Sequence, residues 1–403
     1  MAAGKVTVKE AQELIRRVAV KKQETDEAVL WEAGGRVLAE DLRARFSHPP
    51  FPRSPLDGYA VQAQDLKDAG PDGPACLQVT EKVCAGQCSK RRLKPGEAVR
   101  IMTGAPIPAG ADTVVRQEDT DYGEREVRIY KRQDAYDNYC PEGEDFREGD
   151  VLIRQGARMD AVRIGIAASA GYSRIRVRKK VRTAVLSTGT ELCAPGMPLG
   201  EGQIYDSSLY LIAERVRELG GELVMAERVP DEEQALRAYL RRAKTCADLV
   251  VTTGGVSVGE KDLVRKALEQ EGARFLFDRV LVKPGSPTTA SILGTTLVFS
   301  LSGNPFAAAV HLELLVRTAT ASFLGCEETA PSEKEGILIS EFQRPCRTDR
   351  WIRGREESGR IWIPETKEKS GILSSMEGCS CLVKIEKDRE RIAKGEKVWY
   401  IRI

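Results

Sequence analysis

Residues 248–262 read DLVVTTGGVSVGEKD, an apolar run that leads through a glycine-rich loop into a predicted helix. The same order of strand, loop and helix continues on both sides of this stretch. We predict strands at 183–187, 222–229, 248–252, near 275–282 and at 296–301. We predict helices at 208–219, 231–243, 261–271 and from about 305 to 324. Because strands that alternate with helices form parallel sheets covered on both faces, this pattern predicts a central three-layer α/β domain with a parallel-rich sheet.

The chain on the N-terminal side of this domain changes character twice. Thr7 and Glu10 have the spacing of a capping box, which predicts an opening amphipathic helix, and a second helix is predicted over 25–40. The segment HPPFPRSP at 48–55 cannot continue a helix and marks a change of domain. Beyond it, segments rich in Val, Ile and Thr predict a small β domain with strands at 77–84, 97–103, 112–118 and 126–132.

Residues 140–180 return to a mixed pattern, in which we predict a strand at 151–153, a helix at 159–170 and a strand at 174–177. After residue 325 the chain reads as short strands and predicts a terminal β-barrel or sheet. We therefore expect an α/β multidomain protein with small β-rich domains around the central one. The expected domains are a discontinuous mixed α/β domain of 1–45 with 141–180, a β domain of 46–140, the α/β domain of 181–325 and a barrel-like domain of 326–403. In an alternative that we leave open, the first helix packs on the 181–325 domain.

The composition of the 403 residues argues against several classes of protein. Lys and Arg total 62 against 60 Asp and Glu, so the net charge is +2 and bulk charge does not favour nucleic acid as a partner. We identify no apolar run near the ~18 residues of a membrane span and no signal peptide, so we expect a cytoplasmic protein that does not bind membranes. The ten cysteines include no CxxC pair, and there are only two histidines. This pattern favours reduced packing thiols over zinc sites and contains no nucleophilic triad.

Four predicted loops follow strands of the central domain, at the edge where open α/β sheets bind their ligands. They are LSTGTEL at 186–192, TTGGVSVGEKD at 252–262, LVKPGSPT at 281–288 and SLSGNP at 300–305. Glycines and small hydroxyl residues let backbone N–H groups approach an anion, and helix N-termini add positive potential. One such loop alone would be an ordinary turn, and Asp262 alone would be a helix cap. Four such loops at one edge favour a phosphate-bearing ligand.

Motifs along nearly the whole chain resemble those of one family. In order, they are SPLDGYAV (54–61), IMTGAPIPAGAD (101–112), EGED (142–145), LSTGTEL (186–192), GQIYDS (202–207), TTGGVSVGEKD (252–262), KPG (283–285), SLSGNP (300–305) and KSGILSS (369–375). In these motifs and their order the chain resembles the molybdopterin molybdenumtransferases, the MoeA family, which includes the E domain of gephyrin.

The resemblance implies an elongated four-domain homodimer. Its third domain is implied to be similar to the molybdopterin-binding domain of the partner adenylyltransferase. The implied reaction belongs to molybdenum cofactor biosynthesis: adenylylated molybdopterin is cleaved, AMP is released, and molybdenum from molybdate is inserted into the dithiolene. A molybdopterin adenylyltransferase and acceptor molybdoenzymes are the implied partners beyond the second copy.

The resemblance also implies roles for individual residues. Glu191 and Asp262 would hold a divalent cation, usually Mg²⁺, at the diphosphate, with Asp231 and Lys283 as further catalytic candidates. The expected substrate-binding residues of the third domain are Thr253, Gly254, Gly255, Ser257, Gly259, Ser302, Gly303, Asn304 and Pro305. The cleft would be completed, from the other subunit, by Asp57, Thr103 and Asp145. The expected molybdate-binding residues are Lys283, Ser286, Arg353, Ser374 and Ser375.

The chain departs from the family pattern at Thr190, Ser208 and Ser286. The family often has an acidic residue or Asn at the first position, Asn at the second and Lys at the third. Ser286 therefore removes a candidate cation from the molybdate site. Elementary chemistry agrees with the implied reaction, because a cation held by carboxylates compensates the charge of a diphosphate while its bond breaks. Molybdate is a dianion and calls for Lys, Arg and hydroxyl donors.

Three alternative functions stay open at this point. A non-catalytic molybdopterin-binding scaffold would share the fold, although Asp262 and Glu191 are both present. A nucleotide pyrophosphatase that shares only the third domain is disfavoured by the matches at Asp57 and Thr103. A variant that inserts tungsten has no distinguishing feature in the sequence.

Overall fold

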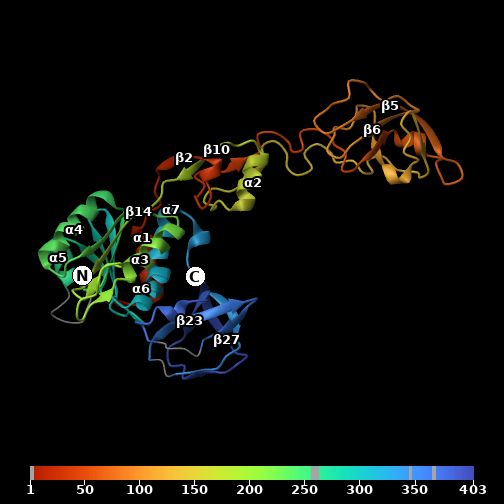
Figure 1. Ribbon diagram of the computed structural model, residues 1–403. Coiled ribbons are helices and arrows are strands. Elements are labelled where there is room, and N and C mark those ends of the chain that lie inside the picture. The colour runs from red at the N-terminus through yellow and green to blue at the C-terminus, as the bar shows by residue number, and fades with distance from the viewer. Residues whose placement is uncertain (1–3, 256–262, 345–346, 365–368) are drawn as a thin grey trace.

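The computed structural model describes residues 4–255, 263–344, 347–364 and 369–403. The molecule is elongated, and a β domain lies well apart from the main body at the end of a narrow connection (Figure 1). We call this β domain, which runs from β4 (Gly58–Val61) to β8 (Glu126–Ile129), the distal domain. The main body holds the central α/β domain and a C-terminal β domain, and a small mixed domain lies between the main body and the distal domain.

The central domain is a six-stranded sheet with helices on both faces. Its strands run in the order β14-β11-β15-β20-β19-β16, and the first four are parallel to one another. β19 is antiparallel to both of its neighbours. The strands are β11 (Arg182–Thr188), β14 (Glu222–Val229), β15 (Leu249–Thr253), β16 (Arg274–Phe277), β19 (Thr289–Leu293) and β20 (Thr296–Leu301). The predicted α/β sheet is confirmed, with β19 as a strand that the sequence pattern did not identify.

Separate hydrophobic clusters cover the two faces of this sheet. The helices on one face are α4 (Glu233–Cys246) and α5 (Leu263–Gln270). The helices on the other face are α1 (Val8–Val18), α3 (Ser208–Glu218), α6 (Pro305–His311) and α7 (Arg317–Leu324). β15 and β20 are buried along their whole length. Strands that are covered on both faces read as unbroken apolar runs, which is why the sequence pattern identified them.

A π-helical turn at Leu312–Val316 joins α6 and α7 into one continuous helix over Pro305–Leu324. By length and composition this helix is apolar enough to cross a membrane, so the expectation that no such segment exists is wrong. Within the protein, 89% of its apolar window is buried, and it contacts α1, α3 and β20. A helix that is covered on all sides is apolar all round, which accounts for its composition.

The N-terminal segment packs on the central domain. β1 (Lys5–Val6) pairs with β17 (Arg279–Val280), and α1 contacts α7 and the π-helical turn. The capping box at the start of α1 is present. The Glu10 N–H donates to the Thr7 hydroxyl oxygen, and the Thr7 N–H donates to the Glu10 carboxylate at 2.7 Å. α1 thus begins where its sequence pattern predicts.

The mixed domain joins chain segments from before and after the distal domain. Its elements are β2 (Thr25–Val29), the 3-10 turn η1 (Leu30–Glu32), β3 (Leu42–Arg43), β9 (Val151–Ile153), α2 (Ala161–Ser169) and β10 (Arg174–Arg178). β2 pairs with β10 and β3 pairs with β9, both antiparallel. The predicted helix over 25–40 is wrong, because the backbone of 25–29 pairs with β10 and Gly35, at φ 75°, turns the chain.

The distal domain is a five-stranded sheet in the order β7-β4-β6-β5-β8. Its strands are β4 (Gly58–Val61), β5 (Ala75–Val83), β6 (Glu97–Ile101), β7 (Thr113–Arg116) and β8 (Glu126–Ile129). Short 3-10 turns lie at Ala63–Leu66 and Gln117–Asp119. All residues of β4 are buried, including Tyr59 and Val61. The residues that directly follow the aspartate of the Asp-Gly-Tyr motif therefore belong to the core of this domain.

The C-terminal domain is a small closed barrel. Pairings run from β23 through β24, β21, β27 and β25 and return to β23. Its strands are β21 (Lys334–Leu338), β22 (Phe342–Gln343), β23 (Asp349–Glu357), β24 (Arg360–Trp362), β25 (Cys381–Ile385), β26 (Arg391–Ile392) and β27 (Lys397–Arg402). β18 (Val282–Lys283), from the central domain's chain, pairs with β23. This pairing places Lys283 where the central domain and the barrel meet.

Candidate functional site

The backbones of the loops at the carboxyl ends of β11, β15 and β20 lie close to one another. The Thr253 hydroxyl donates to the Ser302 carbonyl oxygen at 3.1 Å and ties the loop after β15 to the loop after β20. Gly254 has a φ of 85°, and a Cβ atom there would lie 1.9 Å from the Thr188 carbonyl oxygen. A Cβ atom at Gly303 would lie 3.4 Å from the Gly254 Cα. Glycine is thus required for this approach, which leaves the edge open to an anionic group.

Two of the expected acidic residues lie at the same edge. Asp231 follows β14, and its Oδ1 accepts a hydrogen bond from the Thr188 hydroxyl at 3.1 Å. The same oxygen lies 3.9 Å from the Cβ position of Gly255. Glu191 follows β11, and its carboxylate folds back so that Oε2 lies 2.7 Å from the Cβ position of Gly189. The structure therefore places Glu191 and Asp231 on neighbouring strand ends.

Three expected site residues, Ser257, Gly259 and Asp262, lie outside the described residues. Among the residues that the structure does describe, no group of three or more His, Cys, Asp or Glu side chains is arranged to hold a metal ion. The described cysteines, which include the spaced pairs Cys84 with Cys88 and Cys379 with Cys381, are free thiols.

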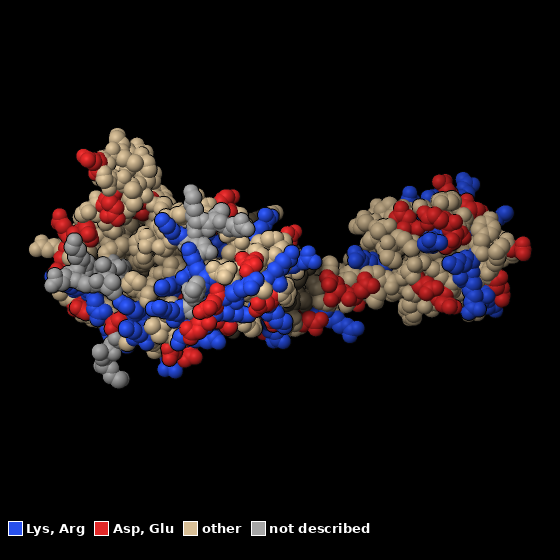
Figure 2. Space-filling view, turned by 90° about the horizontal axis from the view of Figure 1, so that it is seen from below, with Lys and Arg blue, Asp and Glu red and all other residues tan. Residues whose placement is uncertain are grey.

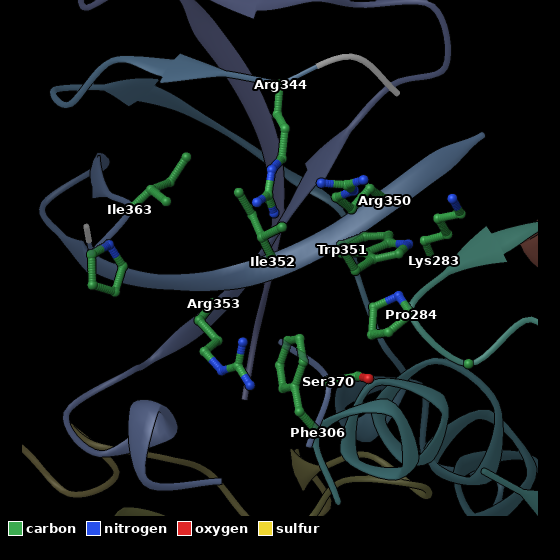
Figure 3. Close-up of a pocket in the computed structure, with 12 residues that line it drawn as sticks. Lys283, Pro284, Phe306, Arg344, Arg350, Trp351, Ile352, Arg353, Ile363 and Ser370 are labelled. Atoms are coloured by element: carbon green, nitrogen blue, oxygen red, sulfur yellow. The ribbon is translucent and has the colours of Figure 1, made fainter. Parts of the chain in front are cut away.

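A pocket of about 300 Å³ lies where the central domain meets the C-terminal barrel (Figure 3). Four cationic side chains line it, together with mostly apolar groups. The lining residues are Lys283, Pro284, Gly285, Phe306, Arg344, Arg350, Trp351, Ile352, Arg353, Ile363, Pro364 and Ser370. Figure 3 shows Arg344, Arg350 and Lys283 around one side of the pocket and Arg353 on the other. Like charges gathered in a hollow attract an anion, so this pocket suits an oxyanion.

The charged side chains on the surface are distributed differently over the main body and over the distal domain. On the face seen in Figure 2, Lys and Arg side chains gather over the main body. On the distal domain the same view shows a compact group of acidic side chains together with separate basic ones.

Arg353 is the most deeply buried of the four pocket cations, with 5% of its surface exposed. Its guanidinium carbon lies 3.5 Å from the centre of the Phe306 ring. Its Nη2 donates to the carbonyl oxygens of Lys369 and Ile372, at 3.2 and 2.6 Å. Arg353 therefore fixes the backbone of the KSGILSS motif beside the pocket, and stacking on an aromatic ring holds its own plane in place.

Helix α6 runs between the pocket and the sheet edge. Its first residue, Pro305, follows Asn304, whose N–H lies 3.3 Å from the Ser302 hydroxyl oxygen. Proline suits the first position of a helix because its missing N–H has no partner to lose there. The N–H of Phe306 donates to the Ser370 carbonyl oxygen at 3.1 Å. One rigid element thus joins the expected substrate loop 302–305 to the pocket.

The loop of residues 281–288 carries Lys283 and closes on itself. The Ser286 hydroxyl donates to the Val280 carbonyl oxygen at 2.9 Å, and the Thr288 hydroxyl donates to the Gly285 carbonyl oxygen at 2.9 Å. Ser286 is absent from the pocket lining given above. The hydroxyl that stands where the family often has lysine therefore stabilises the loop itself.

The three serines of the KSGILSS motif differ in their position relative to the pocket. Ser370 lines the pocket. Ser374 begins the 3-10 turn Ser374–Met376, and the Ser375 hydroxyl donates to the Ile372 carbonyl oxygen at 2.9 Å. Neither Ser374 nor Ser375 is among the described residues that line the pocket.

The expected residues from the first half of the chain lie around the distal domain. Asp57 Oδ1 accepts hydrogen bonds from the Thr103 N–H and hydroxyl, both at 2.7 Å, and these bonds lower the pKa of Asp57. The N–H of Asp145 donates to the His48 carbonyl oxygen at 3.0 Å. A pocket of about 450 Å³ lies beside Thr103 and is also lined by Arg53. Asp57 directly precedes β4 and Thr103 follows β6. Within one chain, the distal domain that holds these strands is remote from the central sheet (Figure 1).

Comparison with known proteins divides the chain as its structure does. Residues 6–171 match the MoeA N-terminal region (domain I and II), residues 184–321 a probable molybdopterin binding domain, and residues 340–403 the MoeA C-terminal region (domain IV). A molybdopterin molybdenumtransferase of Bacillus subtilis is 34% identical over 92% of this chain and 88% of its own length. One from Staphylococcus epidermidis is 32% identical over 94% of this chain and 91% of its own.

The chain belongs to the MoeA family of molybdopterin molybdenumtransferases. The crystal structure of a molybdopterin biosynthesis MoeA protein from Pyrococcus horikoshii superimposes with a TM-score of 0.86. It is 28% identical and covers 99% of this chain and 100% of its own. Membership of the family makes this protein a transferase of molybdenum cofactor biosynthesis.

Several residues of the MoeA-like site were missed by sequence reasoning. Arg344 and Arg350 line the pocket but stand in the arginine-rich stretch RPCRTDRWIRGRE, 344–356, where spacing alone does not select them. The position of Arg350 depends on the pairing of β23 with β18 and β25, and that of Arg344, which directly follows β22, depends on the pairing of β22 with β26. All of these pairings are long-range features. Asp206 is buried, accepts a hydrogen bond from the Ser187 hydroxyl and caps the start of α3 through the Leu209 N–H at 3.1 Å. Asp206 belongs to the GQIYDS motif, and this motif could have pointed to it from the sequence.

Proposed function

We propose that this protein inserts molybdenum from molybdate into adenylylated molybdopterin and releases AMP. One observation carries the proposal: α6 joins a glycine-lined sheet edge to a pocket that holds Lys283, Arg350 and Arg353. The edge suits the diphosphate of the adenylylated substrate, and the pocket suits the molybdate dianion. A scaffold that only bound molybdopterin would have no use for the second of these sites.

In this proposal the sheet edge binds the diphosphate through backbone N–H groups of the loops after β11, β15 and β20. The Thr188 hydroxyl fixes Asp231, because it donates to its Oδ1. The pocket holds molybdate next to the start of α6, so that the two reactants meet on one rigid element. Holding two reactants in place converts their encounter into a step within one complex, which lowers the barrier.

A magnesium ion fits the donors of the sheet edge. Glu191 and Asp231 supply carboxylate oxygens there, and Mg²⁺ is usually held by one or two carboxylates together with water and substrate phosphate oxygens. Asp262, outside the described residues, is the further ligand that the family resemblance implies. When bound, the ion would offset the charge of the diphosphate and polarise its phosphoryl oxygens. The Thr188 hydroxyl would keep Asp231 in place for this task.

The two halves of the reaction provide the test, because each depends on a different side chain. We expect Lys283→Ala to raise the molybdate concentration for half-maximal insertion about tenfold or more, equal to ~1.4 kcal/mol, and to leave AMP release largely intact. We expect Asp231→Asn, which keeps the hydrogen bond from Thr188, to raise the Mg²⁺ concentration needed for AMP release. Lys397→Ala, whose exposed side chain lies at the start of β27, is the matched lysine control. If Lys283→Ala leaves the molybdate dependence unchanged, the oxyanion site lies elsewhere.

We further propose that the active form is a homodimer in which the distal domain of one copy completes the cleft of the other. The distal domain, whose strands adjoin Asp57 and Thr103, is remote from the central sheet within one chain, so only a second copy could bring these residues there. Asp145, bonded to His48, would join them in the shared cleft. The central domain also exposes an apolar strip next to Glu191. Its residues are Met197, Leu199, Ile204, Tyr205 and Tyr210, each 46–59% exposed. Exposed apolar groups in such number mark an interaction surface.

Light scattering tests the homodimer. We expect the protein to have twice the mass of the 44.4 kDa chain at micromolar concentration, and Ile204→Asp to shift it toward the monomer and to abolish insertion. Tyr122→Asp is the control, because Tyr122 is 48% exposed on the distal domain and its φ of 60° suits aspartate. An active, folded monomer of the unchanged protein would exclude the shared cleft.

The remaining parts of the proposal concern the setting of the enzyme. We propose that it works in the cytoplasm, takes its substrate from a molybdopterin adenylyltransferase and delivers product to acceptor molybdoenzymes. Molybdate and tungstate have the same charge and shape, so the pocket would accept both. Paired titrations with the two oxyanions measure the preference.

A further inference from the structure

His311 is fully buried at the end of α6, beneath the loop that carries Lys283. Its Nε2 lies 3.1 Å from the Pro284 carbonyl oxygen. A carbonyl oxygen can only accept, so Nε2 carries the proton and donates it to this bond. Within the described part of the chain, Nδ1 has no hydrogen-bond partner. Burial lowers the pKa of His311 to about 4, which leaves the ring neutral at physiological pH.

The ring also shapes the loop by direct contact. Gly285 has a φ of 85°, and a Cβ atom there would lie 2.6 Å from His311 Cδ2 and 3.2 Å from the Ala307 Cβ. The loop therefore lies directly on α6 and has no room for a side chain at this point. The hydrogen bond to Pro284 and the contact at Gly285 together fix the two residues that follow Lys283.

The same helix positions the other side of the pocket. The Phe306 ring, in the first turn of α6, lies 3.5 Å beneath the Arg353 guanidinium. α6 thus sets Arg353 through Phe306 at one end and the Lys283 loop through His311 at the other. The two cations are on different domains, and this helix is a common support for both.

We propose that His311 is a positioning residue for the oxyanion pocket. His311 holds the Lys283–Gly285 loop on α6 and so sets the position of Lys283 relative to Arg353. It acts through Lys283 and does not touch molybdate. The inference rests on the proposed function, because it assumes that Lys283 binds the oxyanion. A neutral, fully buried imidazole with one proton committed to a carbonyl is suited to this role and not to proton transfer with substrate.

The test measures binding of inorganic molybdate to the full-length protein by equilibrium dialysis, without turnover. We expect His311→Leu to weaken binding at least tenfold. We expect His311→Gln, whose amide can still donate to the Pro284 carbonyl, to stay within threefold of the unchanged protein. Val316→Ala, which removes buried methyl groups from the same continuous helix, should stay within threefold although its melting temperature falls. If His311→Leu cannot be isolated folded, His311→Met provides a second variant without the donor.

A double-mutant comparison shows whether His311 acts through Lys283. In a Lys283→Ala background, we expect His311→Leu to change molybdate binding less than twofold, because the group that it positions is gone. If His311→Leu still weakens molybdate binding tenfold in that background, the inference is overturned. It is also overturned if His311→Leu alone binds molybdate normally, or if Val316→Ala weakens molybdate binding as much as His311→Leu does. If Lys283→Ala itself binds molybdate normally, the oxyanion assignment of the proposed function fails as well. Normal binding by His311→Leu beside weakened Lys283→Ala overturns only the positioning role.

Discussion

Replacing Gly254 with alanine tests the close approach of strand ends on which the proposed diphosphate site depends. The new Cβ atom would lie 1.9 Å from the Thr188 carbonyl oxygen, and the residue sits at φ 85°. The obstacle is backbone, which cannot rotate away as a flexible side chain can. The loops after β11 and β15 would have to separate by about 1.5 Å to restore an ordinary contact in a closely packed region.

The expected cost has two parts. Holding alanine in the left-handed region costs about 1–2 kcal/mol. Forcing extra volume into a packed site typically costs about 1–3 kcal/mol more. Gly272→Ala separates the two, because Gly272 has a φ of 77° and no described heavy atom within 4 Å of its Cβ position. We therefore expect a loss of about 2–5 kcal/mol for Gly254→Ala and about 1–2 kcal/mol for Gly272→Ala.

Urea unfolding followed by circular dichroism measures both losses, and AMP release from adenylylated molybdopterin measures the functional effect. Gly272→Ala should keep normal AMP release, since it leaves the sheet edge unchanged. Gly254→Ala should lose it even at temperatures where the variant is folded. The reasoning is refuted if Gly254→Ala is no less stable than Gly272→Ala, or if it releases AMP at the normal rate.

Other predictions concern the distal domain, a surface ion pair and the Lys283 loop. Asp57→Asn should abolish insertion. It should leave the melting temperature nearly unchanged, because Asp57 is partly exposed where its carboxylate accepts the hydrogen bonds from the Thr103 N–H and hydroxyl. Thr103→Val, assayed in parallel, should show the same loss of insertion and the same small change in melting temperature. The pKa of Glu271 is lowered to about 2, chiefly by Arg241, so its stabilising effect is present above about pH 4.5 and lost as the pH falls toward 2. The stability gap between the unchanged protein and Glu271→Gln should therefore close over that range in urea titrations, and a gap that persists at pH 2 would contradict this assignment. Ser286→Ala should cost about 0.5–1.5 kcal/mol in the same assay, because one loop-closing hydrogen bond is lost. Molybdate half-saturation should stay within twofold in Ser286→Ala, whereas a larger change would mean that this hydroxyl reaches the oxyanion.

Much of the fold follows from local sequence patterns. The strands 249–253 and 296–301 are buried on both faces, and their apolar runs gave nearly correct boundaries. The glycines after β15 were identified from sequence because glycine lets backbone N–H groups approach an anion, and the structure places Gly254 and Gly255 in the left-handed region that favours glycine. Local patterns failed at residues 25–40, where pairing with the distant strand β10 decides the structure, and at β19, whose partners on both sides are antiparallel.

The candidate site divides in the same way. The sequence by itself determined the family, the strand-end loops and the presence of Lys283 and Arg353, because each of these depends on residues that are neighbours in the chain. Only the tertiary structure decided that Arg344 and Arg350 join them, that the Ser286 hydroxyl turns inward to its own loop, and that His311 supports Lys283. The Ser286 bond is local, but the other contacts join residues far apart in the chain, through the pairing of β18 with β23 and of β22 with β26 and the packing of α6 against the loop. Spacing along a chain contains no information about which distant backbone segments will pair, so contacts of this kind become visible only when the domains are assembled.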